Sequence, residues 1–254
     1  MNNPEKYLEH VATKRQSLGA HFAATSVAGL AMLEAKMNVT GQENIPEDGP
    51  VIFAANHVSD ADAVVLNGYL YLHHRVPTIL AKDGLFTPPV IGNYMRGIHA
   101  LPVARGAGAA NLPVLDTALR VLERGDAVMV YPEGSSGRGE DYWPIRGKSG
   151  LGYLALHSEA PVIPIAQWGA QNILHRDENG KKRISLLPLR KPVDVVIGEP
   201  MSFTPDVLPE GLNENQQNQA VSDLVMSAIT RRLAEIRGES PRGYYASFTN
   251  LEVS

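Results

Sequence analysis

The sequence predicts an α/β fold, with a single domain built on a mixed or parallel central sheet flanked by helices, plus an N-terminal helical extension. Short apolar runs at 51–55 and 127–131 have the length and composition of buried strands. Helical patterns alternate with such runs along the chain, as they do where helices connect the strands of one sheet. The chain has 254 residues, room for one large domain or two small ones, and no linker divides it convincingly.

In the first half, residues 5–37 are expected to form one or two helices, followed by a polar connector that ends in a turn near residue 49. Helical spacing from residue 63 to 70 predicts a helix that Ser59 or Asp60 can cap. A further short helix is expected at 90–96. The expected strands of this half are 51–55, 77–81 and 99–104.

In the second half, an amphipathic helix at 112–124 is closed by Gly125, and a strand follows at 127–131. A charged turn is expected at 175–183, and the segment after Gly238 has no periodicity. The remaining expected elements are helices at 151–158 and 214–237 and strands at 162–167 and 193–197. The predicted organisation is a helical, membrane-facing extension at 1–37, a domain at 38–237 and a tail at 238–254.

Composition excludes several classes of protein. The 23 basic and 27 acidic residues leave a net charge of −4, so no global basic field indicates nucleic-acid binding. The chain has no cysteine, which excludes a disulfide scaffold, a cysteine-based zinc site, an iron–sulfur cluster and a thiol nucleophile. The first residues lack the basic start and apolar core of a secretory signal.

Residues 16–33 form the longest uncharged run, 18 residues, which is near the lower limit for a membrane span. The run carries His21 and Thr25, and its apolar residues are mostly alanine. Its sequence is compatible with a helix packed on the domain, a helix lying on a bilayer surface, or a true span.

A first polar cluster directly follows the strand at 51–55, where ligand sites of open α/β sheets gather. An aspartate five residues after His57, at Asp62, can hydrogen-bond the imidazole, set its tautomer and favour the imidazolium that forms on proton uptake. This is the arrangement of a general base that acts on a hydroxyl. The alternative is a capping loop in which His57 only packs and Asp60 or Asp62 caps the helix.

Two further clusters follow expected strands. Arg105 leaves the strand at 99–104, and a guanidinium there suits a phosphate or carboxylate, although a solvated surface arginine is the alternative. Glycines and serines at 134–139 let a backbone approach an anionic ligand closely, and Glu133 is suited to bind a hydroxyl or brace this loop. The alternative is a flexible surface turn. Arg138, Arg146 and Lys148 add local positive charge.

Common catalytic motifs fail on spacing. Gly147-Lys-Ser lacks the upstream glycine of a phosphate-binding P-loop, and Ser136 has an arginine where a nucleophile elbow needs glycine. No dinucleotide-binding glycine motif follows a strand. His57, Asp60 and Asp62 have no second histidine cluster to support them as metal ligands, so no metal is expected.

In order and spacing, these blocks resemble the glycerolipid acyltransferase family, most closely the 1-acylglycerol-3-phosphate acyltransferases. The resemblance covers about 38–202. The matching residues are Asn56, His57, Ser59 and Asp62; Gly97, Leu101, Pro102, Val103 and Arg105; Tyr131, Pro132, Glu133 and Gly134; and 162–165 with 197–200. The third block departs from the family pattern, because Ser135-Ser136 stand where Thr-Arg is usual.

The resemblance implies an O-acyltransferase that moves a fatty acyl group from acyl-CoA or acyl carrier protein to lysophosphatidate, giving phosphatidate, without any bound cofactor. His57 would be the base and Asp62 its orienting partner. Substrate binding would fall to Asn56, Ser59, Arg105, Glu133, Gly134, Ser135, Arg138, Arg146 and Lys148. The expected location is peripheral, on the cytoplasmic side of a membrane, or cytoplasmic. The alternatives are another lysophospholipid, glycerol 3-phosphate or a glycolipid as acceptor, a non-catalytic lipid-binding protein, or a metal-dependent phosphohydrolase.

Overall fold

The structure is a computed structural model that describes residues 4–15, 33–104, 111–137, 139–177, 181–185 and 189–247, and the single residues 19, 26, 29, 106 and 187. Arg105 and Arg138 of the predicted site lie outside the described residues, as does most of the uncharged run at 16–33. In the described part of the chain, no helix is both long enough and apolar enough to cross a membrane.

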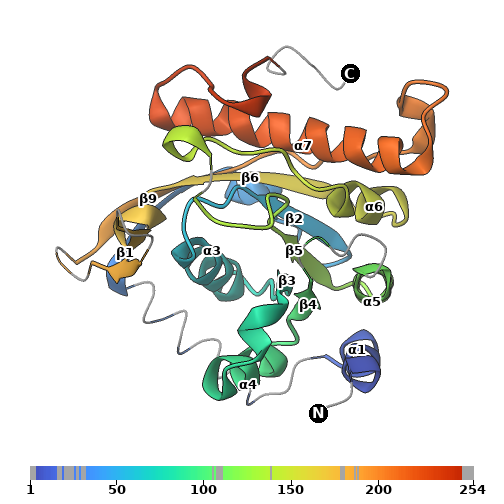
Figure 1. Ribbon diagram of the computed structural model, residues 1–254, viewed down its shortest axis with the longest axis horizontal. Helices are drawn as coiled ribbons and strands as arrows, with labels where there is room; N and C mark the ends of the chain where they lie inside the picture. Colours follow the sequence, from blue (N-terminus) through green and yellow to red (C-terminus); the bar gives the residue numbers. More distant parts are fainter. Residues whose placement is uncertain are drawn as a thin grey trace.

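The described residues form a central sheet of seven strands in the order β1-β9-β6-β2-β5-β3-β4 (Figure 1). Neighbouring strands are parallel except for the antiparallel pair of β6 and β9. The strands are β1 Ala35–Thr40, β2 Val51–Ala55, β3 Thr78–Lys82, β4 Leu101–Val103, β5 Ala127–Val130, β6 Val162–Trp168 and β9 Lys191–Ile197. β7 Leu174–Arg176 and β8 Lys182–Ile184 form a separate antiparallel hairpin. The predicted α/β class with a mixed sheet is confirmed.

Helices cover both faces of this sheet, with α6 and α7 on one side and α3 on the other (Figure 1). The helices are α1 Pro4–Thr13, α3 Ala61–Leu72, α4 Pro89–Gly97, α5 Leu112–Glu123, α6 Gly150–Leu156 and α7 Glu214–Arg237. Short 3₁₀ helices are η1 Gln42–Asn44, η2 Asp83–Phe86, η4 Glu140–Tyr142, η5 Ala170–Asn172, η6 Pro205–Val207 and η7 Tyr244–Ser247. Along β2, Ile52 and Ala54 belong to one core and Val51, Phe53 and Ala55 to the other, as the two-residue period of a strand requires.

The last helix has the limits that the sequence predicts. The side chain of Asn213 accepts a hydrogen bond from the backbone of Gln216, whose side chain in turn accepts one from the backbone of Asn213. This capping box satisfies two of the free N–H groups at the start of α7. Gly238 ends the helix with a φ of 61°, a left-handed conformation that glycine adopts without steric cost.

The prediction that helical structure extends to residue 37 is wrong, because the strand β1 begins at Ala35. β1 pairs in parallel with β9, which lies about 150 residues later in the chain, and Ala35 stands opposite Lys191. The predicted charged turn at 175–183 is also only partly right, since its two ends belong to β7 and β8. Both differences involve short strands whose formation depends on a partner rather than on a strong local pattern.

Segments at both ends of the chain pack into the core. Tyr7 of α1 is buried, and its hydroxyl donates a hydrogen bond to the carbonyl of Ala100 at 2.6 Å. Tyr245 of η7 is fully buried; its hydroxyl donates to Asp223 and accepts from the backbone N–H of Gly147, each at 2.9 Å. These contacts tie the first helix and the segment after α7 to the loops that surround the sheet.

Candidate active site

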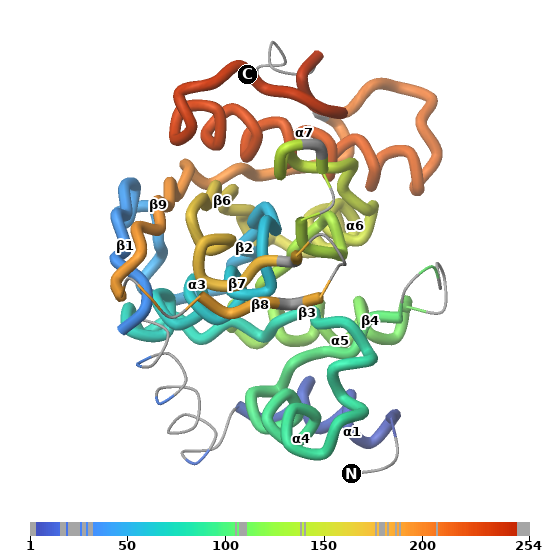
Figure 2. Tube along the Cα trace, turned by 60° about the vertical axis from the view of Figure 1, so that its left-hand side comes forward, coloured from blue at the N-terminus to red at the C-terminus, as the bar shows by residue number. Residues whose placement is uncertain are grey.

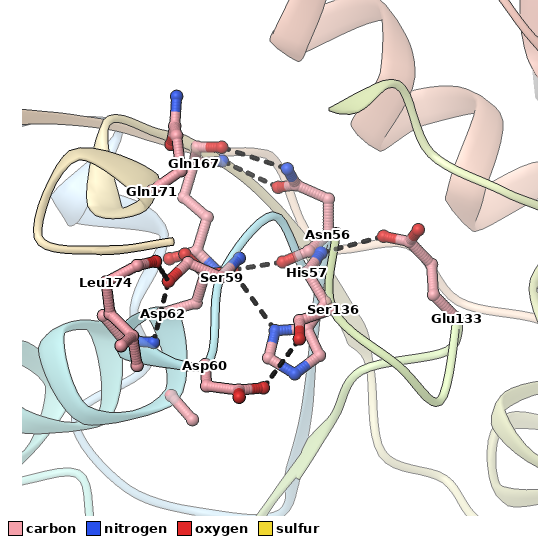
Figure 3. Close-up of polar contacts among 12 residues, drawn as sticks. Asn56, His57, Ser59, Asp60, Asp62, Glu133, Ser136, Gln167, Gln171 and Leu174 are labelled. Atoms are coloured by element: carbon pink, nitrogen blue, oxygen red, sulfur yellow. Dashed lines mark hydrogen bonds and ion pairs between the residues drawn. The ribbon is translucent and has the colours of Figure 1, made fainter. Parts of the chain in front are cut away.

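The candidate site lies where neighbouring parallel strands end. β6, β2 and β5 are adjacent and parallel, so their carboxyl ends meet at one edge of the sheet. Asn56 and His57 follow β2, Glu133 lies three residues after β5, and Gln167 is the second-last residue of β6. Residues far apart in the sequence therefore converge on one small region, which Figure 3 shows.

His57 and Asp62 form a close pair. Nδ1 of His57 lies 3.1 Å from Oδ2 of Asp62, which also accepts a hydrogen bond from the backbone N–H of Ser59 at 2.7 Å (Figure 3). The Asp62 side chain is fully buried, whereas 15% of the His57 side chain is exposed. With Oδ2 serving as acceptor, the imidazole proton belongs on Nδ1, which leaves the lone pair of Nε2 available to accept a proton.

Electrostatics favour the protonated form of this imidazole. Burial lowers the pKa of His57, but the hydrogen bond to Asp62 and the charges of Asp62, Glu133 and Asp60 together outweigh burial and raise the pKa above its ordinary value. Asp62 thus stabilises the imidazolium that forms when His57 takes up a proton. This is the electrostatic arrangement that a general base requires.

Glu133 braces the loop that carries His57. Its Oε1 accepts the backbone N–H of His57 at 2.8 Å, and its Oε2 accepts that of Ile145 at 3.1 Å. Burial raises the pKa of Glu133 to about 7, although these two hydrogen bonds oppose the shift. Of the two roles that the sequence left open for Glu133, bracing is the one that the contacts support.

Asn56 locks the end of β2 to the end of β6. Its side chain donates to the carbonyl of Gln167 at 3.0 Å and accepts the backbone N–H of Gln167 at 2.8 Å. The Gln167 side chain returns a hydrogen bond to the carbonyl of Asn56. Both amide side chains are fully buried, so this exchange holds the residue before His57 in place.

Two more contacts join the His57 loop to the loop after β5. The Ser136 hydroxyl donates to Oδ1 of Asp60 at 2.6 Å, and the backbone N–H of Gly137 donates to the carbonyl of His57 at 2.8 Å. The ring of Tyr131 packs against the imidazole with a centroid separation of 4.6 Å. The orientation of the imidazole ring is therefore fixed by packing against Tyr131 as well as by the hydrogen bond to Asp62.

The other predicted site residues are only partly brought together. Ser59 donates its hydroxyl to the carbonyl of Leu174, which anchors the β7–β8 hairpin beside the site. Gly134 has a φ of 67°, and a Cβ there would lie 3.0 Å from Nζ of Lys148, so Lys148 borders this loop. Arg146 instead faces Asp223 and the ring of Tyr244, near the C-terminal segment. Ser135 is half-buried in the loop.

Two cavities lie near the pair, although neither His57 nor Asp62 lines them. A smaller one of about 290 Å³ is lined by Ser59, Asp60, Ser136 and their neighbours. A larger one of about 930 Å³ lies beside it and includes Trp168, Leu187 and Arg237 in its wall. Asp141, Tyr142 and His175 line both cavities, so the two are neighbours beside the loop that follows His57, and we call them together the recess.

Sequence reasoning missed Gln167, the packing role of Tyr131 and the hydrogen bond between Asp60 and Ser136. A signal existed for Gln167, since it is a polar residue at the end of an otherwise apolar strand run. The Asp60 contact had no comparable signal, because it joins two loops whose proximity depends on the sheet order.

A His–Asp pair with a fully buried aspartate, at the carboxyl ends of parallel strands in an α/β sheet, is an arrangement that can activate a hydroxyl by general-base catalysis. The comparison with protein families is more specific. The Acyltransferase family model matches residues 36–168, which hold β1 to β6 and the whole His57 cluster, and the chain belongs to this family.

Individual proteins are also similar to this chain in sequence or in fold. An uncharacterized protein of Mycobacterium tuberculosis is 34% identical over 148 residues, which cover 54% of this chain but only 38% of that relative. A 1-acyl-sn-glycerol-3-phosphate acyltransferase of Bacillus subtilis is 27% identical over 71% of this chain and 81% of its own length. The crystal structure of the 1-acyl-sn-glycerophosphate acyltransferase from Thermotoga maritima has the same fold, with a TM-score of 0.63 at 21% identity, over 95% of this chain and 86% of that one.

Proposed function

We propose that this chain transfers a fatty acyl group from the thioester of acyl-CoA or acyl carrier protein to the free hydroxyl of lysophosphatidate, giving phosphatidate. Family membership supports acyl transfer to a glycerolipid. The observation that carries the mechanism is the 3.1 Å contact between His57 and the fully buried Asp62, beside a recess. The choice of lysophosphatidate rests on the name of the Bacillus subtilis relative.

In this mechanism, neutral His57 holds its proton on Nδ1 and uses Nε2 to accept the proton of the acceptor hydroxyl. The hydroxyl oxygen attacks the thioester carbonyl and forms a tetrahedral intermediate. The carbon–sulfur bond then breaks, and the leaving thiolate takes the proton from the imidazolium, which regenerates neutral His57. Asp62 stabilises the imidazolium between these steps. The route needs no acyl-enzyme and agrees with the lack of any cysteine.

The recess is the proposed place for the lipid substrates. Its larger part, about 930 Å³, has the size of a small-molecule site and contains apolar wall residues at Trp168, Tyr142 and Leu187. Arg105 follows β4, whose carboxyl end lies on the same sheet edge as β2, three strand positions or about 14 Å away. We assign Arg105, with Lys148 beside Gly134, to the phosphate of the acceptor, and we place the enzyme at the cytoplasmic surface of a membrane as a peripheral protein.

The test is a thiol-release assay on the purified chain. Palmitoyl-CoA, oleoyl-CoA and an acyl carrier protein thioester are supplied with a panel of acceptors that includes lysophosphatidate, other lysophospholipids and glycerol 3-phosphate. Thiol release that depends on lysophosphatidate is the expected result. Release with a different acceptor would contradict the assigned substrate and keep the mechanism. No release with any donor and acceptor would favour a lipid-binding protein without catalytic activity.

Arg105→Ala is expected to raise the KM for lysophosphatidate by about 10-fold or more, because a charge-assisted contact to phosphate is lost. The KM for the acyl donor should change much less. Initial-rate measurements with each substrate varied in turn give both constants. Equal changes in the two KM values would contradict a phosphate clamp.

The pH dependence follows from the raised pKa of His57. Only neutral His57 acts as a base, so kcat/KM should fall as the pH is lowered through a midpoint above 6.5, the ordinary pKa of histidine. Because the charge of Glu133 helps to raise the pKa of His57, Glu133→Gln should move this midpoint to lower pH. Glu123→Gln, an exposed change at the end of α5, is the control and should leave the midpoint in place. A midpoint unchanged in Glu133→Gln would contradict the assigned coupling.

A further inference from the structure

The segment around the β7–β8 hairpin differs in charge from the rest of the chain. Residues 175–191 contain six lysines and arginines but only two acidic residues, in a protein whose net charge is −4. The excess is therefore local, and the remainder of the chain is more acidic than the total indicates. A basic segment of this kind is attracted to the anionic surface of a membrane.

The same segment exposes apolar side chains. Ile184, Leu187 and Leu189 are 69%, 76% and 59% exposed, and they stand within six residues of each other. Exposed cations flank them at Lys181, Arg183 and Arg190, as the residues of an interfacial element do. Single exposed apolar residues are common on protein surfaces, but a group of three bordered by cations is typical of contact with a partner.

The hairpin is held in a defined place. Leu174 of β7 stands opposite Ile184 of β8, and Arg183 pairs with Asp177 at 2.9 Å. The buried Lys191 at the base of the segment donates to the carbonyl of Ser185 at 2.7 Å. In Figure 2 the hairpin lies in front of the central sheet, so its outer edge is available to a surface that approaches from that side.

The hairpin also borders the candidate site. The carbonyl of Leu174 accepts the Ser59 hydroxyl three residues before Asp62, and His175 lines both parts of the recess. Leu187 is at once a wall residue of the larger part and the most exposed of the three apolar side chains. A bilayer that contacted this edge would meet the recess at the same place.

We propose that this edge docks the protein on an anionic bilayer and presents the recess to the lipids there. We call it the docking edge. It consists of Lys181, Arg183, Ile184, Leu187, Leu189 and Arg190. The apolar side chains would enter the boundary between headgroups and acyl chains, and the cations would lie at the level of the lipid phosphates. The partner is an anionic membrane because its charge is complementary to the edge and, on the proposed function, acceptor and product are themselves anionic lipids of the bilayer.

The experiment is sedimentation of the full chain with vesicles of phosphatidylcholine alone and with 30 mol% phosphatidylglycerol, a lipid that is neither the proposed substrate nor the proposed product. The charge variant is Lys181→Gln with Arg190→Gln, which leaves the Arg183–Asp177 pair intact. The loss of two interfacial cations should weaken binding to the anionic vesicles by about 25-fold at low salt. The apolar variant, Ile184→Ser with Leu189→Ser, should weaken binding by about 10-fold.

The matched control is Val90→Ser with Ile91→Ser in α4, where Val90 is 82% and Ile91 is 45% exposed, and it should bind as the unaltered chain does. Circular dichroism checks that each variant is folded. The proposal is overturned if the unaltered chain binds no anionic vesicle, if both docking-edge variants bind like it, or if the α4 control loses as much binding as they do. Binding that is equally strong on neutral vesicles would also overturn it, since charge would then have no part.

Failure of the docking edge and failure of the proposed function give different results. His57→Ala should bind vesicles like the unaltered chain and lose acyl transfer. The charge variant should bind vesicles poorly and keep its turnover on short-chain substrates that are dispersed as monomers, because it changes no residue assigned to the site. Loss of that turnover in the charge variant would overturn the separation of docking from catalysis.

Discussion

Replacing His57 by alanine is expected to lower kcat for acyl transfer by about 10²–10⁴-fold, the usual contribution of a positioned general base. Without the imidazole, no group takes the proton of the acceptor hydroxyl as its oxygen attacks the thioester. The effect should fall on kcat rather than on the KM of either substrate, because the proton moves only in the chemical step. Thiol release under saturating donor and acceptor measures it.

The matched control for this change is His157→Ala. His157 follows α6, where its ring stacks on Tyr153 and its side chain is 39% exposed. Both variants remove an imidazole, but only His57 has a buried aspartate partner next to the recess. Turnover close to that of the unaltered chain in His57→Ala would exclude His57 as the base. An equal loss in His157→Ala would attribute the effect to folding, which circular dichroism checks independently.

Replacing Asp62 by asparagine is expected to lower kcat by a similar factor, about 10²–10⁴-fold, although the side chain keeps its size. Oδ2 of Asp62 accepts two hydrogen bonds, from His57 Nδ1 and from the backbone of Ser59. An asparagine oxygen at the position of Oδ2 can accept both of these hydrogen bonds, so the imidazole proton stays on Nδ1. What the substitution removes is the buried negative charge that stabilises the imidazolium as the substrate proton is transferred.

Asp60→Asn separates this effect from a general loss of negative charge. Asp60 also raises the pKa of His57, but its hydrogen bond runs to Ser136 and an asparagine oxygen can accept it. We expect kcat to change by less than about 10-fold in this variant. A loss in Asp60→Asn as large as that in Asp62→Asn would show that the direct contact with His57 is not what Asp62 contributes. The same rate assay measures both variants.

The core strands and the long helices were predictable because their signals are local. β2 and β5 are unbroken apolar runs that are buried on both faces of the sheet. A strand covered by a core on each face requires such a run, so the sequence pattern predicts it directly. The limits of α7 follow from a capping box at Asn213 and a glycine at 238, which act within one turn of the helix. The order of polar residues after strands likewise placed His57, Asp62 and Glu133 in one region.

The short edge strands were not predictable in the same way. β1 alternates weakly between buried and exposed residues, and it becomes a strand because β9 supplies its hydrogen bonds. From the sequence, the β7–β8 hairpin is predicted to be a charged turn, because its strands have only three residues each and carry basic side chains. The place of the docking edge beside the recess is a tertiary feature, because the hydrogen bond from Ser59 to the carbonyl of Leu174 joins the hairpin to the loop after His57.

The sequence alone determined the α/β class, the principal helices and strands, and the residue types that could activate a hydroxyl, because helix caps, apolar runs and the His-x₄-Asp spacing act within a few residues. Only the tertiary structure decided that Glu133 braces the His57 backbone, that Asn56 is locked to Gln167, and that Arg146 faces the C-terminal segment instead of the recess. These roles depend on which strands are neighbours in the sheet. Each of the three contacts joins residues more than 70 positions apart in the chain, which no local pattern records.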